Sequence, residues 1–177
     1  MPTDLQQVDR VLLAELGIPD NYGSDPVLAL YAEATSLVEV GPNIVGREQR
    51  LTPESAAAWQ AMQNVAKADD VQLVMVSGFR SVSYQADLIR KKLAAGQEVD
   101  AILKTNVAPG YSQHHTGNAI DIATPGYKPL LEEFEESPAF AWLRDNAIQF
   151  GFTLSYPRDN PEGVIYEPWH WYRAPDT

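Results

Sequence analysis

The chain has 177 residues, of which 13 are Lys or Arg and 24 are Asp or Glu, so its formal net charge is −11. Hydrophobic residues make up 45% and charged residues 21%, which is typical of one globular domain and excludes disordered, collagen-like and coiled-coil chains. A sequence pI of about 4.6 argues against nucleic-acid binding, because the acidic surface repels phosphates and the one basic cluster, Arg90 to Lys92, is small.

The sequence contains no cysteine, so it can form neither disulfides nor thiolate sites. Its first 20 residues lack the basic and apolar regions of a signal peptide, and no run approaches the roughly 18 apolar residues of a membrane-spanning helix. As given, the chain is therefore expected to be cytoplasmic and without a membrane span. If a leader has been trimmed from it, the periplasm or cell envelope is the alternative.

The N-terminal region is expected to be an arm rather than a second core. Residues 5–16 carry an apolar stripe at helical spacing. Residues 20–51 are rich in Gly, Pro and Asn around a short apolar piece, 27–37, which predicts a wrapping arm with one helix. We therefore expect a single domain, with residues 1–50 as an N-terminal helical arm and residues 51–177 as the catalytic core.

Within the core, the local signals predict helices and short strands in alternation. Helices are expected over 53–68 and 140–150, and strands over 71–79, 118–123 and the aromatic segment 164–172. This arrangement predicts an α+β fold with a small, mostly antiparallel sheet flanked by helices.

A further helix is predicted between Ser81, which can cap its start, and Gly96, which can end it. Its inward face would carry Tyr84, Leu88 and Leu93.

The three histidines lie in two places, each with a carboxylate nearby: His114 and His115 precede Asp121, and His170 follows Glu167. Without cysteine, a transition-metal site must use histidine and carboxylate ligands. Asp121 lies among apolar residues of a predicted strand, where an unpaired carboxylate is costly to bury. A metal ion or an arginine would remove that cost. Spacing alone leaves two alternatives open: a metal site, or a salt-bridged core aspartate with surface histidines.

Three motifs, in order, resemble one protein family. The run SQHHTGNAID (112–121) is similar to the S-x-H-x-x-G-x-A-x-D signature of the VanY-type D-alanyl-D-alanine carboxypeptidases, and EPWH (167–170) is similar to their E-x-W-H. SGFRS (77–81), with Gln85 four residues later, resembles their substrate-site arginine segment. The motifs span residues 77–172, more than half of the chain. The resemblance implies a zinc peptidase of the lysostaphin, D-Ala-D-Ala peptidase and hedgehog superfamily, whose small antiparallel sheet carries the metal.

Carried over residue by residue, the resemblance implies that His114, Asp121 and His170 bind Zn²⁺. It makes Glu167 the general base that takes a proton from the attacking water, and Arg80 the cation that steadies the scissile carbonyl or the oxyanion. A straight strand would point Glu167 and His170 to opposite faces, so we expect a twist or bulge between them.

Other residues receive weaker assignments. Ser112, Gln85 and Tyr156 fall where the family contacts substrate, whereas Ser155 stands where several relatives carry a basic residue, which leaves specificity open. Neighbouring residues rarely reach the same metal ion, so His115 is expected to face solvent or to support a ligand.

An acidic substrate needs positive charge, because the protein itself carries a net charge of −11. We expect that charge from the metal, Arg80 and Arg158. The basic cluster Arg90 to Lys92 is expected to form a solvated helix face.

The sequence therefore predicts a zinc carboxypeptidase that removes the C-terminal D-Ala from peptidoglycan stem peptides or muropeptides. Both D,D and L,D specificity share the motifs, and the absence of an export signal favours L,D cleavage of recycled tetrapeptides. The alternatives are an L-alanyl-D-glutamate endopeptidase of the same fold, a non-catalytic zinc-stabilised binding module, and a metal-free interaction domain. The oligomeric state is open.

Overall fold

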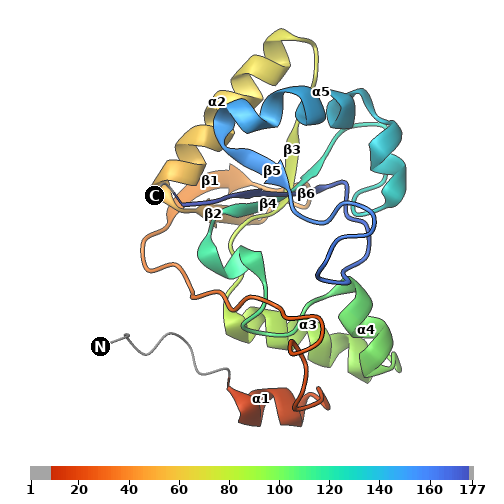
Figure 1. Cartoon of the computed structure of the whole chain (residues 1–177). Coiled ribbons are helices and arrows are strands. Elements are labelled where there is room, and N and C mark those ends of the chain that lie inside the picture. The colour runs from red at the N-terminus through yellow and green to blue at the C-terminus, as the bar shows by residue number, and fades with distance from the viewer. Residues whose placement is uncertain (1–8, 176–177) are drawn as a thin grey trace.

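The computed structural model describes residues 9–175 as an α+β domain (Figure 1). Its helices are α1 Arg10–Glu15, α2 Pro53–Ala68, α3 Val82–Ala94, α4 Val99–Thr105 and α5 Pro138–Asn146. Its strands are β1 Val38–Pro42, β2 Glu48–Leu51, β3 Val74–Ser77, β4 Ala119–Ala123, β5 Phe152–Leu154 and β6 His170–Arg173. Three 3₁₀ helices are η1 Gln113–Thr116, η2 Glu132–Glu136 and η3 Ala147–Phe150. Among the described helices, none combines the length and apolar character that crossing a bilayer requires.

Four strands form one antiparallel sheet in the order β3-β4-β6-β5, and β1 pairs with β2 in a separate hairpin. The expected α+β fold with a small antiparallel sheet is therefore confirmed. In the pairing of the two central strands, Asp121 lies directly opposite His170. The sheet register thus places two of the predicted metal ligands side by side.

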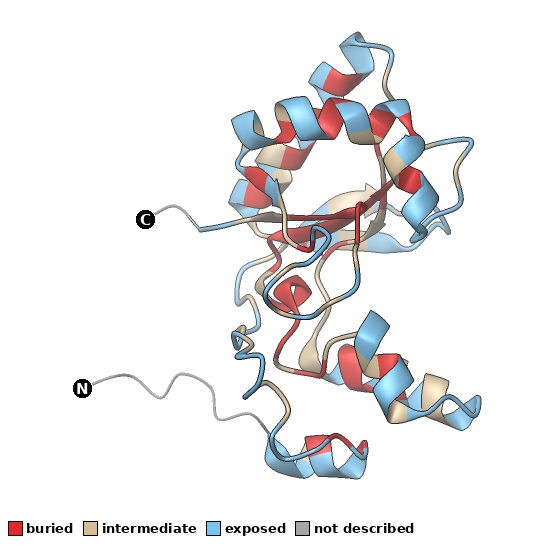
Figure 2. Cartoon of the chain, turned by 45° about the vertical axis from the view of Figure 1, so that its right-hand side comes forward, coloured by how far each residue is buried: buried red, intermediate tan, exposed pale blue. Residues whose placement is uncertain are grey.

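The buried residues form two hydrophobic cores, one in the upper and one in the lower part of the view in Figure 2. One core fills the space between the sheet and the helices α2 and α5 and includes Ile120 and Ile122 of β4. The other gathers residues of α1, α3 and α4. Because strand side chains alternate, Asp121 points away from the core that holds its two isoleucine neighbours. All five residues of β4 are buried, so both faces of this strand are covered.

The expected helix within residues 27–37 is wrong. Apart from an isolated bridge between Ser24 and Val27, this stretch is irregular, and the hairpin β1–β2 follows it. Its backbone groups pair with a distant segment instead of with each other: Tyr31 N donates to Gly110 O at 2.8 Å, and Ala34 N donates to His115 O at 2.8 Å. The expected helix over 5–16 is observed from Arg10, and its first residues lie outside the described part of the chain.

Helix α3 begins after Ser81 as predicted, with the Ser81 hydroxyl accepting from Tyr84 N at 3.0 Å. Its inward face differs from the prediction in part: the buried residues are Gln85, Ala86 and Ile89, and Tyr84 is 42% exposed. Leu93 does pack against the second core, as predicted. Helix α4, which the sequence analysis did not anticipate, packs beside α3.

Candidate active site

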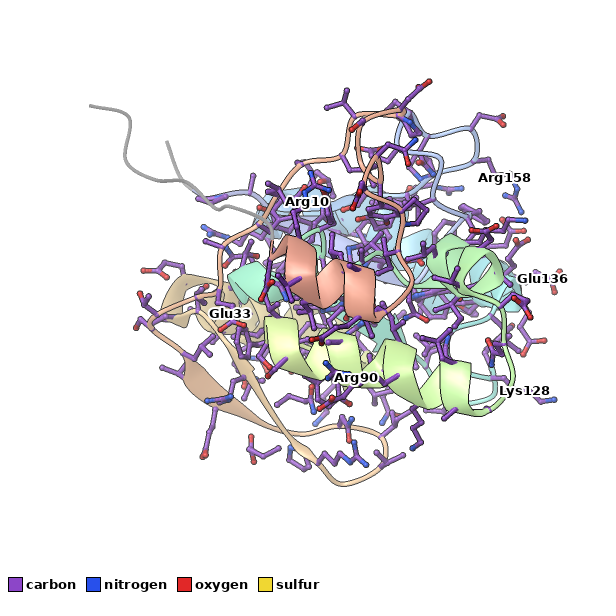
Figure 3. All side chains as sticks on the ribbon, turned by 90° about the horizontal axis from the view of Figure 1, so that it is seen from below. Arg10, Glu33, Arg90, Lys128, Glu136 and Arg158 are labelled. Carbon is purple, nitrogen blue, oxygen red and sulfur yellow. The ribbon has the colours of Figure 1, made fainter. Side chains whose placement is uncertain are left out.

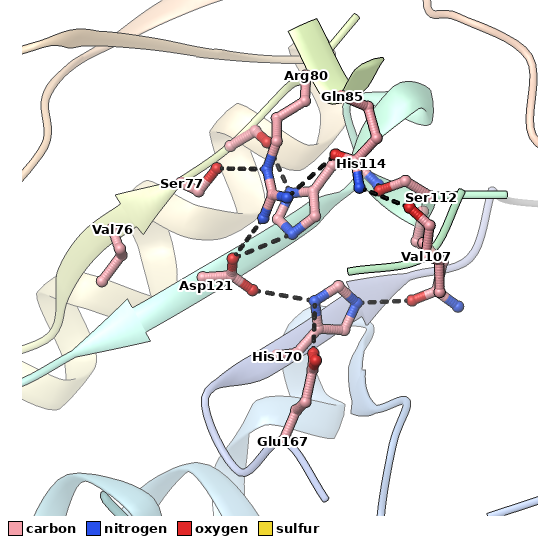
Figure 4. A network of polar contacts seen from close by, with 12 residues as sticks. Val76, Ser77, Arg80, Gln85, Val107, Ser112, His114, Asp121, Glu167 and His170 are labelled. Atoms are coloured by element: carbon pink, nitrogen blue, oxygen red, sulfur yellow. Dashed lines mark hydrogen bonds and ion pairs between the residues drawn. The ribbon is translucent and has the colours of Figure 1, made fainter. Parts of the chain in front are cut away.

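The structure brings His114, Asp121 and His170 together at the middle of the sheet (Figure 4). One ligand atom from each residue lies within 4.8 Å of the others, and each residue is only 3% exposed. Gly117 makes this convergence possible, because its φ of 69° turns the chain from η1 into β4. A side chain at Gly117 would also bring its Cβ within 2.8 Å of Leu37.

The ring of His114 presents a lone pair to Asp121. Its Nδ1 lies 2.7 Å from Gly78 O, and since a carbonyl oxygen only accepts, Nδ1 carries the proton. Its Nε2 lies 3.2 Å from Asp121 Oδ2, yet this buried nitrogen has no hydrogen-bond partner. An unprotonated nitrogen and a carboxylate oxygen therefore face each other.

The ring of His170 is held with its proton on the other nitrogen, Nε2. Its Nε2 donates to Gln113 Oε1 at 2.8 Å, and the same oxygen accepts from Ser155 Oγ at 2.7 Å. This leaves His170 Nδ1 as the second lone pair, 3.0 Å from Asp121 Oδ1. Two nitrogen lone pairs and one carboxylate that converge in a buried space fit a metal cation, because only a cation satisfies all three.

The electrostatics of the cluster agree with metal binding. Burial, together with the Arg80 charge, lowers the pKa of His114 to about 4, so the ring is neutral at neutral pH. Although burial opposes ionisation, the contacts of Asp121 with His114, His170 and Arg80 hold its pKa well below the usual range. Neutral histidine and ionised carboxylate are the states in which these groups bind metals.

Glu167 reaches the cluster from a turn. Its backbone N donates to Tyr156 O at 3.0 Å, and His170 N donates back to Glu167 O at 3.2 Å. This turn, rather than a bulge within the strand, brings Glu167 Oε2 to 3.9 Å from His170 Nδ1. The side chain is nearly buried, and burial raises the pKa of Glu167 to about 7. A carboxylate of this kind can both accept and release a proton near neutral pH.

Arg80 lies on the other side of Asp121 from Glu167 (Figure 4). Its Nε donates to Ser77 Oγ at 2.9 Å, its Nη1 to Gln85 Oε1 at 3.3 Å and its Nη2 to Asp121 Oδ2 at 2.8 Å. Both alternatives drawn from spacing thus hold in part: Asp121 has an arginine partner, but the histidines beside it are buried rather than on the surface.

The predicted substrate residues Ser112, Gln85 and Tyr156 line one cleft together with the metal cluster, Arg80 and Glu167. Ser112 Oγ accepts from His114 N at 3.2 Å, and Gln85 Nε2 donates to Val107 O at 2.8 Å. The Tyr156 ring lies 4.9 Å from that of His170, measured between centroids.

His115 neither faces solvent nor points at the cluster. It is completely buried, and its Nδ1 donates to Arg80 O at 2.7 Å while its Nε2 accepts from Gly110 N at 3.0 Å. Its ring therefore ties the segment before η1 to the backbone of Arg80. Of the two alternatives expected for His115, the solvent-facing one is wrong, and the supporting one applies to Arg80 rather than to a predicted metal ligand.

The expected contribution of Arg158 to the cleft is also wrong. Its guanidinium pairs with both oxygens of Glu135 at 2.8 Å and lies over the Tyr166 ring at 3.9 Å from the centroid. Figure 3 shows it at the periphery of the molecule.

Sequence reasoning missed two residues of the site. Gln113, which orients His170, lies next to a predicted ligand but belongs to none of the signature positions. Lys92, expected on a solvated helix face, lines the cleft instead. No local signal identified either residue.

A buried His-Asp-His cluster, flanked by a glutamate and an arginine on a small antiparallel sheet, defines a metallopeptidase centre of the hedgehog-like fold. The sequence profile of the VanY D-alanyl-D-alanine carboxypeptidases matches residues 48–175, and the chain belongs to this family.

The chain is similar to several characterised proteins. It is 34% identical over 122 residues to a D-alanyl-D-alanine carboxypeptidase of Enterococcus faecalis, a match covering 63% of this chain and 44% of the relative. The LdcB LD-carboxypeptidase structure superposes with a TM-score of 0.69 and 29% identity, covering 88% of this chain and 71% of LdcB. The structure of a D,D-pentapeptidase VanY mutant with Zn(II) superposes with a TM-score of 0.60 and 28% sequence identity, and the match covers 78% of each chain. The chain spans less than half the length of three of its curated relatives.

Proposed function

We propose that this chain is a zinc-dependent carboxypeptidase that removes the C-terminal D-Ala from peptidoglycan stem peptides. The observation that carries the proposal is the convergence of two histidine lone pairs on the carboxylate of Asp121, with Glu167 Oε2 3.9 Å from one of them. The relative from Enterococcus faecalis is named for D-alanyl-D-alanine carboxypeptidase activity, which supports the same reaction class.

Zinc is the metal that this donor set favours, since two imidazoles and one carboxylate form a three-ligand site with an open position. His114, Asp121 and His170 would hold it, and a bound zinc ion would polarise the scissile carbonyl and acidify water. Glu167 takes the proton from the attacking water and passes it to the leaving amine.

Arg80 faces the same cleft with a guanidinium fixed by three contacts, and it stabilises the negative charge that develops on the carbonyl oxygen. Ser112, Gln85 and Tyr156 contact the peptide. A fixed donor stabilises developing charge without having to reorganise during the reaction, which is the benefit of holding Arg80 at three points.

For specificity, we favour L,D cleavage of tetrapeptides over D,D cleavage of pentapeptides. What supports this preference is the likeness to the LD-carboxypeptidase LdcB, which covers 88% of this chain. The TM-scores themselves do not rank the two specificities, since an L,D-carboxypeptidase DacB gives 0.55 and the D,D-pentapeptidase VanY gives 0.60.

Mass spectrometry of the products from tetrapeptide and pentapeptide muropeptides, with and without chelator, tests the proposal. We expect D-Ala to be released from the zinc-loaded protein and not after treatment with chelator. Release from the tetrapeptide should be faster than release from the pentapeptide. Faster cleavage of the pentapeptide would reverse the L,D preference. Cleavage between L-Ala and D-Glu would instead identify an endopeptidase, and the absence of any product would identify a binding module.

A further inference from the structure

The cleft contains a second cation besides Arg80. Lys92 lies seven residues after Gln85 on α3, and the two side chains share one face of that helix. Both line the cleft that holds the metal cluster. The segment 105–107 forms the cleft wall opposite this face. Gln85 Nε2 donates a hydrogen bond to Val107 O, and Lys92 Nζ donates one to Asn106 Oδ1.

Lys92 has no negative partner. Its ammonium donates to the neutral amide of Asn106, and among residues 9–175 no carboxylate forms an ion pair with it. Partial burial and the nearby charge of Arg80 both lower the pKa of Lys92. Although the protein has 24 acidic residues, none of those described pairs with the half-buried ammonium of Lys92. This ammonium lies in the candidate active site together with a second cation, Arg80. Such an arrangement is unfavourable unless an anion binds there.

The helix itself does not account for this placement. Cations near a helix C-terminus interact favourably with the helix dipole, and Lys91 and Lys92 both lie in the last turn of α3. Lys91 is exposed and fulfils that role from the surface, whereas Lys92 points into the cleft. The pair therefore provides a matched comparison: the same residue type on the same helix turn, inside and outside the cleft.

We propose that Lys92 is a specificity-determining residue that binds the free C-terminal carboxylate of the substrate peptide. The inference rests on the proposed function, which puts the scissile carbonyl between the metal cluster and Arg80. The residue that leaves then extends along α3, past Gln85, and its carboxylate meets the Lys92 ammonium beside Asn106. Charge-assisted pairing of this kind requires a free carboxylate, so Lys92 makes the enzyme an exopeptidase.

The test pairs variants with substrates. Values of kcat and KM are measured for Lys92→Gln, Lys92→Arg and the control Lys91→Gln on a tetrapeptide stem with a free C-terminus and on its C-terminal amide. We expect Lys92→Gln to lower kcat/KM for the free acid by about tenfold or more, mainly through KM, and to leave the amide unchanged. Lys92→Arg should retain most of the activity, and Lys91→Gln should match the wild type on both substrates.

Equal losses on acid and amide, or no loss on either, would overturn the assignment. A stem peptide can carry a second carboxylate near its C-terminus, on the side chain of a diaminopimelate at the third position, and a substrate with L-Lys at that position lacks it. If the effect of Lys92→Gln disappears with that substrate, Lys92 binds the diaminopimelate carboxylate and the assignment is wrong.

Calorimetric titration of the metal-free proteins with the same peptides separates this inference from the proposed function. Wild type should bind the free acid more tightly than the amide, and Lys92→Gln should bind both equally. That difference is expected even if no hydrolysis is found in zinc, in which case only the proposed function fails. A wild type that shows no preference for the acid would overturn the role of Lys92, whatever the enzyme cleaves.

Discussion

Gln113 decides which nitrogen of His170 is free for a metal. Its Oε1 accepts from His170 Nε2, and its own amide donates to Tyr31 Oη at 3.4 Å, which favours this orientation of the amide. Groups that orient a ligand in this way commonly change metal affinity by 10–100-fold when they are removed.

We therefore predict that Gln113→Leu weakens zinc binding by about 10–100-fold, because the His170 ring loses its acceptor. Competition with a chromophoric chelator measures the affinity. Gln113→Glu keeps an acceptor at the same place and should retain tight binding. Equal affinity of Gln113→Leu and wild type would remove Gln113 from the site.

Glu167→Gln is predicted to keep the fold and the zinc but to lower kcat by roughly 10²–10⁴, since an amide cannot take a proton from water. Rates are compared with the zinc content of the same preparations. Hydrolysis at close to the wild-type rate would mean that another group is the base.

Arg80→Lys tests whether the guanidinium acts on the reaction or on the fold. Lysine keeps the charge next to Asp121 but cannot contact Ser77, Gln85 and Asp121 at once. We expect a fall in kcat with an unchanged melting temperature of the zinc-bound protein. A large loss of thermal stability would instead mark Arg80 as structural.

At the level of elements, side-chain contacts join the segment between Tyr156 and Glu167 to the 3₁₀ helix η2. Arg158 pairs with Glu135 through two hydrogen bonds, and Tyr166 Oη donates to the same carboxylate at 3.0 Å. The hydrogen bonds from Arg158, and then that from Tyr166, lower the pKa of Glu135 from 4.5 to about 2.

The folded state therefore favours ionised Glu135. Its stabilising effect is complete above about pH 4.5 and is lost as the pH falls through about 2. We predict that the wild type melts above Glu135→Gln at neutral pH and that this difference vanishes toward pH 2. Because these groups are exposed, added salt should shrink the difference at neutral pH. A difference that is independent of both pH and salt would contradict the assignment.

Local signals predicted the elements that begin with a clear cap or contain a single apolar run. Helix α2 begins after Thr52, whose hydroxyl accepts from Ser55 N, and β3 and β4 lie within the predicted runs. The segment 27–37 has an apolar composition that fits a helix, but its backbone is paired with residues 110–115 instead. Such long-range pairing leaves no trace in local composition.

The face of α3 depends on tertiary packing in the same way. Tyr84 is apolar enough to suggest the inward side, but α4 covers the side that carries Ile89, and α4 itself is a seven-residue helix without a side-chain cap. That rotation of the helix turns Gln85 and Lys92 toward the cleft. The metal cluster was predictable because a motif fixes its three residues, whereas no motif includes Lys92 or Gln113.

For the whole molecule, the metal cluster lies where the two hydrophobic cores meet. Asp121 and His170 belong to the sheet, which the first core supports, and His114 belongs to η1, whose preceding segment contributes Tyr111 to the second core. A bound ion would therefore join the two halves of the domain, and ligand binding to the folded state alone raises its stability.

We predict that zinc raises the melting temperature. At free zinc 1,000-fold above Kd the gain is about 4.1 kcal/mol, or roughly 8–16 °C for a domain of this size. Calorimetric scans with zinc and with chelator measure the shift. His170→Ala should show little or none, and an equal shift in that variant would place the stabilising ion elsewhere.

The position of β6 in the sheet has a consequence for how the protein is made. This strand is the last described element in the chain, yet it lies between β4 and β5. Until β6 has been synthesised, one edge of β4 is therefore unpaired, β5 has no partner strand, and no His170 lies opposite Asp121. Unpaired strand edges are where nascent chains associate with the wrong partner. The ribosome must release β6 before the sheet can close, so protection by chaperones would matter most in the interval between the synthesis of β4 and that of β6.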